Sequence, residues 1–237
     1  SISGANEHKI DSIVDALAAA HQRGQQVILV TSGAIATGLP LLGLDVKPED
    51  LATSQALASV GQGRLISRYQ QSLERYGIIA GQVLLTAQDL EGEETTVNAK
   101  RAMERLLELR VIPIVNENDT VATAEIRFGD NDRLGALVAV LVDADALILL
   151  SDVDALYDMP PTKPGAMRIE RIGYGEDISA IEIGGSGTSV GTGGAVTKVS
   201  AAKVANDAGV AVLLTSSDLV NDALSGANIG TWFEPKG

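Results

Sequence analysis

Residues 111–140 read VIPIVNENDTVATAEIRFGDNDRLGALVAV, and the order of residue types in this stretch decides the expected fold. It opens with an apolar run from Val111 to Val115, which predicts a buried strand. Polar residues follow at 116–119 and at 130–132, and a helical apolar pattern resumes at Leu134. A strand, polar residues and then a helix are typical of an open α/β sheet, whose ligands bind at the carboxyl ends of the strands.

The two polar groups bring acids and amides together. Their members are Asn116, Glu117, Asn118, Asp119, Asp130, Asn131 and Asp132. Such side chains often only bond to nearby backbone in turns and helix caps, which would account for Asp130 before a helix. Turn chemistry does not readily explain two tight groups, so the pattern favours a polar pocket.

Composition excludes several classes of protein. The 237 residues include no cysteine and two histidines, His8 and His21, which excludes disulfides and thiolate chemistry and disfavours His-ligated metals and Ser-His-Asp hydrolases. The formal net charge of −13 should repel nucleic acid and acidic membrane surfaces. No apolar run approaches the ~18 residues of a membrane span, so we expect a cytoplasmic protein.

The rest of the chain alternates between helical and strand patterns. Helices are expected near residues 7–23, 52–76, 95–109, 134–142, 195–209 and 219–224, the second interrupted around Gly61 and Gly63. Strands are expected at 27–30, 78–85, 111–115, 146–150 and 210–214, with a final edge strand in 229–235. This alternation predicts a parallel, doubly wound sheet. We expect one domain of two lobes that meet near residue 145.

Two further stretches suit phosphate groups. Thr31-Ser32-Gly33 is a small-residue turn between a strand and a helix, and GGSGTSVGTGG (184–194) leads into a helix with Lys198 in its expected first turn. An ordinary βα connection and a surface loop with a solvated lysine are the plain alternatives. Together with the polar groups, these features can supply the positioning and charge that phosphoryl transfer needs.

Five motifs with these residues resemble the amino acid kinase family, and most specifically its glutamate 5-kinase branch. They are VTSGAIATG (30–38), GQVLLT (81–86), VNENDTVATAEIRFGDNDRL (115–134), LLSDVDALY (149–157) and VGTGGAVTKVSAA (190–202). The motifs span nearly the whole chain and keep the family order. The Gly-rich motif alone would indicate only the wider family.

The resemblance implies a three-layer αβα sandwich around a central, mostly parallel sheet. It implies a substrate lobe near residues 1–145 and a nucleotide lobe near 146–237. The implied reaction transfers the γ-phosphoryl of ATP, with Mg²⁺, to the side-chain carboxylate of L-glutamate, the first step of proline biosynthesis. Feedback inhibition by proline and a homodimer or homotetramer are implied as well.

The resemblance also implies roles for single residues. For the glutamate site they are Ser32, Asn116, Asp119 and Asn131. Gly33 should offer its amide to the transferring phosphoryl, Lys198 should stabilise the charge that develops there, and Asp132 should orient the lysine. For the nucleotide they are Ser151, Asp152, Thr192, Gly193, Gly194 and Lys198. No residue is assigned to bind a metal ion directly.

The chain departs from the family pattern in two places. The family's first strand, with a Lys-x-Gly-Ser/Thr motif, has no match, so we expect the natural chain to carry it before residue 1. A C-terminal PUA domain, common in bacterial members, is not present in these residues. The alternatives are another phosphotransferase of the family, or a relative that binds nucleotide or glutamate without catalysis.

Overall fold

The computed structural model describes residues 2–46, 48–122, 131–159, 161–176 and 191–237. These residues form two compact units, Ser1–Leu134 and Gly135–Gly237. Asp130 of the second polar group and residues 184–190 of the Gly-rich stretch lie outside the described residues.

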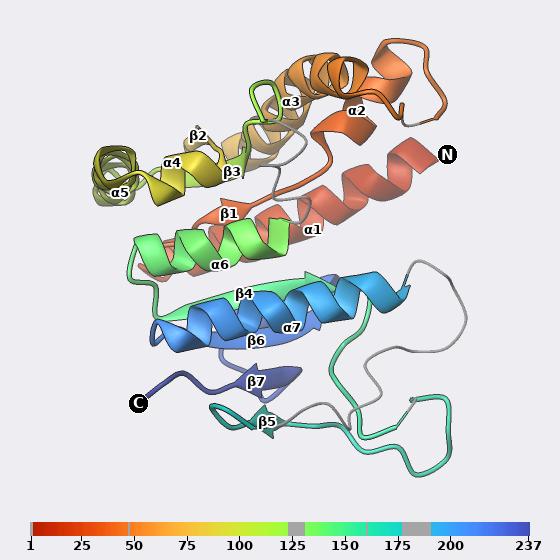
Figure 1. The fold of residues 1–237 in the computed structure, drawn as a ribbon, viewed down its shortest axis with the longest axis vertical. Helices are drawn as coiled ribbons and strands as arrows, with labels where there is room; N and C mark the ends of the chain where they lie inside the picture. Colours follow the sequence, from red (N-terminus) through yellow and green to blue (C-terminus); the bar gives the residue numbers. More distant parts are fainter. Residues whose placement is uncertain (1, 47, 123–130, 160, 177–190) are drawn as a thin grey trace. The chain divides into compact units, whose positions relative to one another are not determined.

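The first unit is built on a parallel sheet of three strands, β1 (Leu29–Val30), β2 (Ala80–Leu85) and β3 (Ile112–Glu117), in the order β1-β3-β2 (Figure 1). Every residue of β3 is buried, as expected of a central strand covered on both faces. Its helices are α1 (Ile2–Gln22), α2 (Ala34–Leu41), α3 (Leu51–Glu74), α4 (Ala87–Glu91) and α5 (Glu93–Glu108).

Two glycines let α2 and α3 pack with their backbones nearly touching. A Cβ added at Gly38 would lie 2.2 Å from the Leu57 carbonyl oxygen, and one at Gly61 would lie 1.8 Å from the Ala34 carbonyl oxygen. The expected break of the long helix at its glycines is therefore wrong, because α3 runs unbroken through both. Gly61 is there for close approach of a second backbone and not for a bend.

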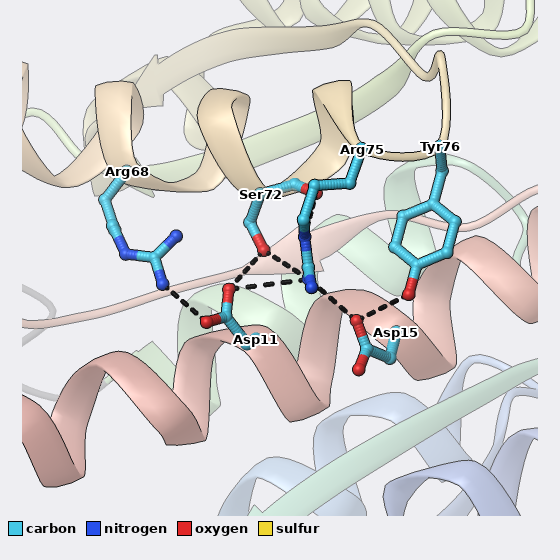
Figure 2. Close-up of polar contacts among 6 residues, drawn as sticks. All are labelled: Asp11, Asp15, Arg68, Ser72, Arg75 and Tyr76. Atoms are coloured by element: carbon cyan, nitrogen blue, oxygen red, sulfur yellow. Dashed lines mark hydrogen bonds and ion pairs between the residues drawn. The ribbon is translucent and has the colours of Figure 1, made fainter.

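A polar network joins α1 to α3 (Figure 2). Asp11 accepts from the Ser72 hydroxyl at 2.6 Å and from Arg68 Nη2 at 2.7 Å, while Arg75 Nη2 bonds to Asp15 at 2.7 Å. The Ser72 hydroxyl, together with Arg68 and Arg75, holds the pKa of Asp11 below its ordinary value. The network fixes how α1 lies along α3.

The second unit holds a sheet in the order β4-β6-β7-β5 (Figure 1). The strands are β4 (Ala146–Ser151), β5 (Arg171–Ile172), β6 (Ala211–Ser216) and β7 (Thr231–Phe233), and the helices are α6 (Asn131–Leu141, which enters this unit at Gly135), α7 (Gly191–Asp207), η1 (Ser217–Leu219) and α8 (Val220–Leu224). Small residues such as Ala201, Ala202 and Ala205 of α7 are buried in one apolar core with Val212 and Leu214 of β6. Small side chains there let the helix lie close to the sheet.

The expected α/β class with mostly parallel strands is confirmed, since β6–β7 is the one antiparallel pair among the strands described. The expected edge strand near the C-terminus is wrong: β7 lies inside the sheet, between β6 and β5. The buried Thr231 explains its place, since its hydroxyl donates to Ile169 O at 2.7 Å and accepts from Leu156 N at 2.8 Å. In the part of the chain that is described, no helix is long and apolar enough to cross a membrane.

Candidate active site

In the first unit, the carboxyl ends of three parallel strands lie side by side. Thr31 N, just after β1, donates to Val115 O at 2.9 Å, and Asn118 N, just after β3, donates to Leu85 O at 2.9 Å. The turn at Thr31–Gly33 therefore lies beside Asn116, the fifth residue of β3. This is the edge at which ligands of parallel α/β sheets bind.

A chain of side-chain amides crosses this edge. Asn116, 2% exposed, donates through Nδ2 to Gln62 Oε1 of α3 at 2.8 Å. Asn131, the first residue of α6, donates through Nδ2 to Asn116 Oδ1 at 3.2 Å and to Thr31 O at 2.6 Å. The chain of bonds ties together α3, β3, the start of α6 and the turn after β1, although these segments are far apart in the sequence.

Thr31 is itself held from α3. Its hydroxyl lies 3.2 Å from the Tyr69 hydroxyl and donates to Ser32 O at 3.3 Å. Burial raises the pKa of Tyr69, so its hydroxyl stays protonated at neutral pH. The pair fixes the backbone just before the two residues that are expected to meet ligands.

Ser32 and Gly33 are exposed at the start of α2. Gly33 precedes the helix with φ of 100° and ψ of 10°, a left-handed conformation that glycine adopts without strain, and among the described residues no side chain caps the helix. The first amides of α2 are thus open to an anion, which a helix N-terminus favours. The predicted contact of the Gly33 amide with the transferring phosphoryl stays a prediction.

Two carboxylates flank the amide chain in sequence. Asp119 is half-buried two residues beyond β3, in a turn where Ala122 N donates to Asn118 O at 3.1 Å and Gln55 Nε2 of α3 holds Ala122 O at 3.1 Å. Asp132 is half-buried in the first turn of α6, where the helix dipole favours a negative charge. Both carboxylates stand close in sequence to amides of the chain.

In the second unit, Ser151 and Asp152 lie at the carboxyl end of β4. Ser151 is the last residue of the strand and is opposite Ser216 of β6, and its hydroxyl donates to Asp152 Oδ1 at 3.1 Å. Asp152 is exposed. Strand β4 therefore has polar residues at its carboxyl end, as β3 has in the first unit.

The expected position of Lys198 in the first turn of its helix is wrong. Helix α7 begins at Gly191, so Thr192, Gly193 and Gly194 form its first turn and the half-buried Lys198 lies about two turns, or ~10 Å, farther along. Glycines are poor helix formers, which is why the pattern placed the start later.

Sequence reasoning missed Gln62 and Tyr69, which reach the site from α3. Their spacing of seven residues places them on one face of the helix, but it is also the ordinary spacing of core residues. A glutamine between two glycines, Gly61 and Gly63, inside a long helix was the available signal. Glycines at that place indicate a backbone packed close to something else.

The structure thus gathers Ser32, Gly33, Asn116 and Asn131 at one edge of the first sheet, with Asp119 and Asp132 close to them in sequence. Ser151 and Asp152 lie at the end of β4, and Thr192–Lys198 lie in α7, both in the second unit. The predicted pairing of Asp132 with Lys198 joins residues of different units and stays a prediction.

Comparison with known proteins finds similar glutamate 5-kinases in several bacteria. Over 236 residues the chain is 66% identical to a glutamate 5-kinase of Clavibacter sepedonicus, which spans 100% of this chain and 91% of that protein. A glutamate 5-kinase of Leifsonia xyli subsp. xyli is 65% identical over 99% of this chain and 87% of its own length. One of Salinispora arenicola is 54% identical over 98% of this chain and 63% of its own length.

A solved structure supports the fold independently of close sequence similarity. The carbamate kinase from Giardia lamblia bound to AMP-PNP superposes with a TM-score of 0.65 over 97% of this chain and 90% of that one, at 16% identity. The amino acid kinase family matches residues 1–216. By this match over most of its length and by its similarity to these relatives, the chain belongs to the amino acid kinase family.

Proposed function

We propose that the protein transfers the γ-phosphoryl group of ATP to the side-chain carboxylate of L-glutamate, giving L-glutamyl 5-phosphate, the first step of proline biosynthesis. The observation that carries this proposal is the exposed Ser32-Gly33 turn beside Asn116 and Asn131, in a chain closely similar to glutamate 5-kinases along its whole length. The chemistry of each unit supports it.

The first unit offers what an amino-acid acceptor needs. Amide oxygens and the Asp119 carboxylate suit a substrate ammonium, and the Ser32 hydroxyl and open helix amides suit carboxylate oxygens. Because these groups stand on a sheet edge and on helix starts, their positions are set by the scaffold. We assign the glutamate site to Ser32, Asn116, Asp119 and Asn131.

The second unit offers what a nucleotide needs. The first turn of α7 presents backbone amides to phosphate oxygens, and Lys198 adds a positive charge. Ser151 and Asp152 supply a hydroxyl and a carboxylate at the end of β4, which can bind polar groups of the nucleotide. We assign the ATP site to Ser151, Asp152 and Thr192–Lys198.

In the reaction, an oxygen of the ionised side-chain carboxylate forms a bond to the γ-phosphorus. The bond between that phosphorus and the β,γ-bridging oxygen breaks, and ADP leaves with the electron pair. No general base is required, because the acceptor is already an anion. The protein's task is to place the reactants and to stabilise phosphoryl charge, by the Gly33 amide and the Lys198 ammonium.

The remaining partners belong to the same proposal. Mg²⁺ enters bound to ATP, where it neutralises phosphate charge. Proline acts as a feedback inhibitor, and the protein works in the cytoplasm as a homodimer or homotetramer. The net charge of −13 supports a protein that binds neither nucleic acid nor acidic membranes.

The test is glutamate-dependent formation of ADP from Mg-ATP, measured with and without proline. Hydroxylamine, which converts an acyl phosphate to a hydroxamate, should trap the product only when both substrates are present. Aspartate, carbamate and UMP are tested as alternative acceptors, each in place of glutamate. Turnover with one of these in place of glutamate would move the protein to another branch of the family, and tight ATP binding without turnover would identify a non-catalytic relative.

A further inference from the structure

Gln62 lies at the inner end of the amide chain. Helix α3 places it against the fifth residue of β3, where its side chain is 8% exposed and its Oε1 accepts from Asn116 Nδ2 at 2.8 Å. Neither the sequence motifs nor the proposed reaction assign it a role. It touches a residue of the proposed glutamate site without belonging to that site.

Backbone groups determine the orientation of the Asn116 and Asn131 amides, and Asn116 in turn determines that of Gln62. Glu117 N donates to Asn116 Oδ1 at 2.9 Å, so the nitrogen of Asn116 must point to Gln62, and Gln62 must turn its oxygen toward Asn116. Thr31 O accepts from Asn131 Nδ2, so the nitrogen of Asn131 points inward. An exchange of oxygen and nitrogen in any one amide would set like groups against each other.

This arrangement leaves the Gln62 nitrogen without a partner. Nε2 is buried and meets no acceptor among the residues that the structure describes. A buried polar atom without a hydrogen bond costs free energy and calls for an explanation. An apolar side chain at position 62 would remove this atom, so stability alone does not explain a glutamine there.

We propose that Gln62 is a positioning residue for the acceptor amino acid, a conclusion that rests on the proposed function. By accepting from Asn116, it holds Asn116 Oδ1 against Asn131 Nδ2. Both hydrogen bonds that Asn131 makes to described residues use that nitrogen, so among these residues its Oδ1 is the atom that remains for a ligand. A carbonyl oxygen accepts from an ammonium group and disfavours a carboxylate. The amide chain therefore directs the ammonium group of the substrate to Asn131 Oδ1.

Two substitutions test the proposal in the full chain. Gln62→Met removes both polar atoms, so Asn116 Nδ2 loses its acceptor while the unpaired Nε2 also disappears. Because one unpaired donor replaces another, we expect the melting temperature to stay within about 3 °C. We expect KM for glutamate to rise about tenfold and KM for ATP to stay unchanged.

Gln62→Glu keeps an acceptor for Asn116 but adds a carboxyl group whose pKa burial will raise. While protonated it is close to glutamine in shape and bonding, and once ionised it places a negative charge beside a site for an anionic amino acid. We expect KM for glutamate in this variant to rise with increasing pH and to approach that of the unchanged protein at low pH. A role in stability alone predicts no such profile.

Ser72→Ala is the matched control. Ser72 is a buried polar residue of the same helix that bonds to Asp11 and not to the amide chain. The Ser72→Ala substitution should lower the melting temperature and leave KM for glutamate unchanged. Equal rises of both KM values, or a large loss of stability in Gln62→Met, would overturn the positioning role.

The side-chain amide ¹⁵N signals of Asn116 and Asn131 give a readout that needs no turnover. Both should shift in Gln62→Met even without substrate, and an unchanged Asn131 signal would overturn the coupling whatever the acceptor is. Failure of the proposed function is a separate result. In that case the protein without any substitution would form no ADP with glutamate.

Discussion

Asn131 makes two hydrogen bonds through one amide nitrogen, to Thr31 O at 2.6 Å and to Asn116 Oδ1 at 3.2 Å. Asn131→Asp keeps the shape but turns an oxygen toward both acceptors. We expect a loss of about 1–3 kcal/mol in the free energy of unfolding, because two bonds become repulsive contacts. KM for glutamate should rise with it, as measured by steady-state kinetics and urea unfolding.

Asn118→Asp is the control for the added charge. It places the same charge near the same sheet edge, but its side chain is not part of the amide chain. A similar rise of KM in both variants would assign the effect to charge and not to the direction of the Asn131 amide.

A substitution of Lys198 tests whether its ammonium group stabilises the charge that develops on the transferring phosphoryl. Lys198→Ala should lower kcat by at least about a hundredfold and change KM for glutamate little, because a lysine that stabilises developing charge acts mainly in the transition state. Lys203→Ala, on the same helix but exposed and paired with Asp207, is the matched control. Unchanged kcat in Lys198→Ala would remove the lysine from the proposed mechanism.

At the residue scale, the sequence predicted which residues meet at the edge of the first sheet, and their roles stay predictions. Ser32, Gly33, Asn116 and Asn131 come from segments around residues 30, 115 and 131, and their meeting follows from the rule that parallel strands end at one edge. Gln62 was not predictable in this way. It acts from a helix interior, and only the pairing of that helix with β3 shows that its side chain meets Asn116.

Among the elements, α2 and α3 depend on glycine for their close approach. Gly61→Ala would place a methyl group 1.8 Å from Ala34 O, at the first residue of α2, so the helices must separate. We expect a loss of about 3 kcal/mol in the free energy of unfolding, and a loss of activity because α2 carries the Gly33 turn. Differential scanning calorimetry and ADP formation measure the two effects.

Gly63→Ala is a control on the same helix. Gly63 is exposed and an added Cβ meets nothing within 4 Å. Alanine there should stabilise the protein by about 0.5–1 kcal/mol, since glycine is the weaker helix former. Equal destabilisation at both positions would show that helix propensity, and not close packing, decides the effect.

The network between α1 and α3 should make stability depend on pH. The pKa of Asp11 is lower in the folded protein than in the unfolded chain. Asp11 therefore stabilises the protein at pH values above its unfolded pKa of about 3.8. That contribution is lost as pH falls through the folded pKa. Asp11→Asn should therefore be less stable at pH 7, and the difference from the unchanged protein should shrink below about pH 4.

Urea unfolding at several pH values measures this difference, and Asp45→Asn is a control at an exposed aspartate. A stability gap for Asp11→Asn that stays constant from pH 7 to pH 3 would contradict the assignment to an ionised Asp11.

The elements show where pattern reasoning fails for physical reasons. Helix propensity predicted a break at Gly61 and a late start for α7, but tertiary packing overrides propensity in both places. The inner position of β7 depends on pairing partners around Ile172 and Leu213, which no local pattern contains. Long, periodic segments such as α5 were predictable within two residues.

For the molecule as a whole, we expect each substrate to protect its own unit from hydrogen exchange. Glutamate should slow exchange at residues 31–33, 116–119 and 131–132, and a non-hydrolysable ATP analogue with Mg²⁺ should slow it at 151–152 and 191–198. Mass spectrometry of the exchanged peptides measures both. Protection of the second group by glutamate alone would contradict the assignment of the two sites.

The fold class was predictable because alternating strands and helices leave few arrangements for a chain of this length. The division into units at residues 134 and 135 falls inside helix α6, where no change of composition marks it. A boundary within a continuous helix is set by which neighbours its two ends pack against. Such neighbours are a property of the folded chain.

The register of the first sheet has a consequence for how the chain folds. Strand β2 pairs with residues 32 positions away, Ala80 with Ile112, whereas β1 must find partners 85 positions away, Leu29 with Ile114. Closing the longer loop costs more chain entropy, so the β1 pairing should form late during refolding and open early during unfolding. That same pairing sets Ser32 and Gly33 beside Asn116. Activity should therefore return as the last event of refolding, after most helical structure has been regained.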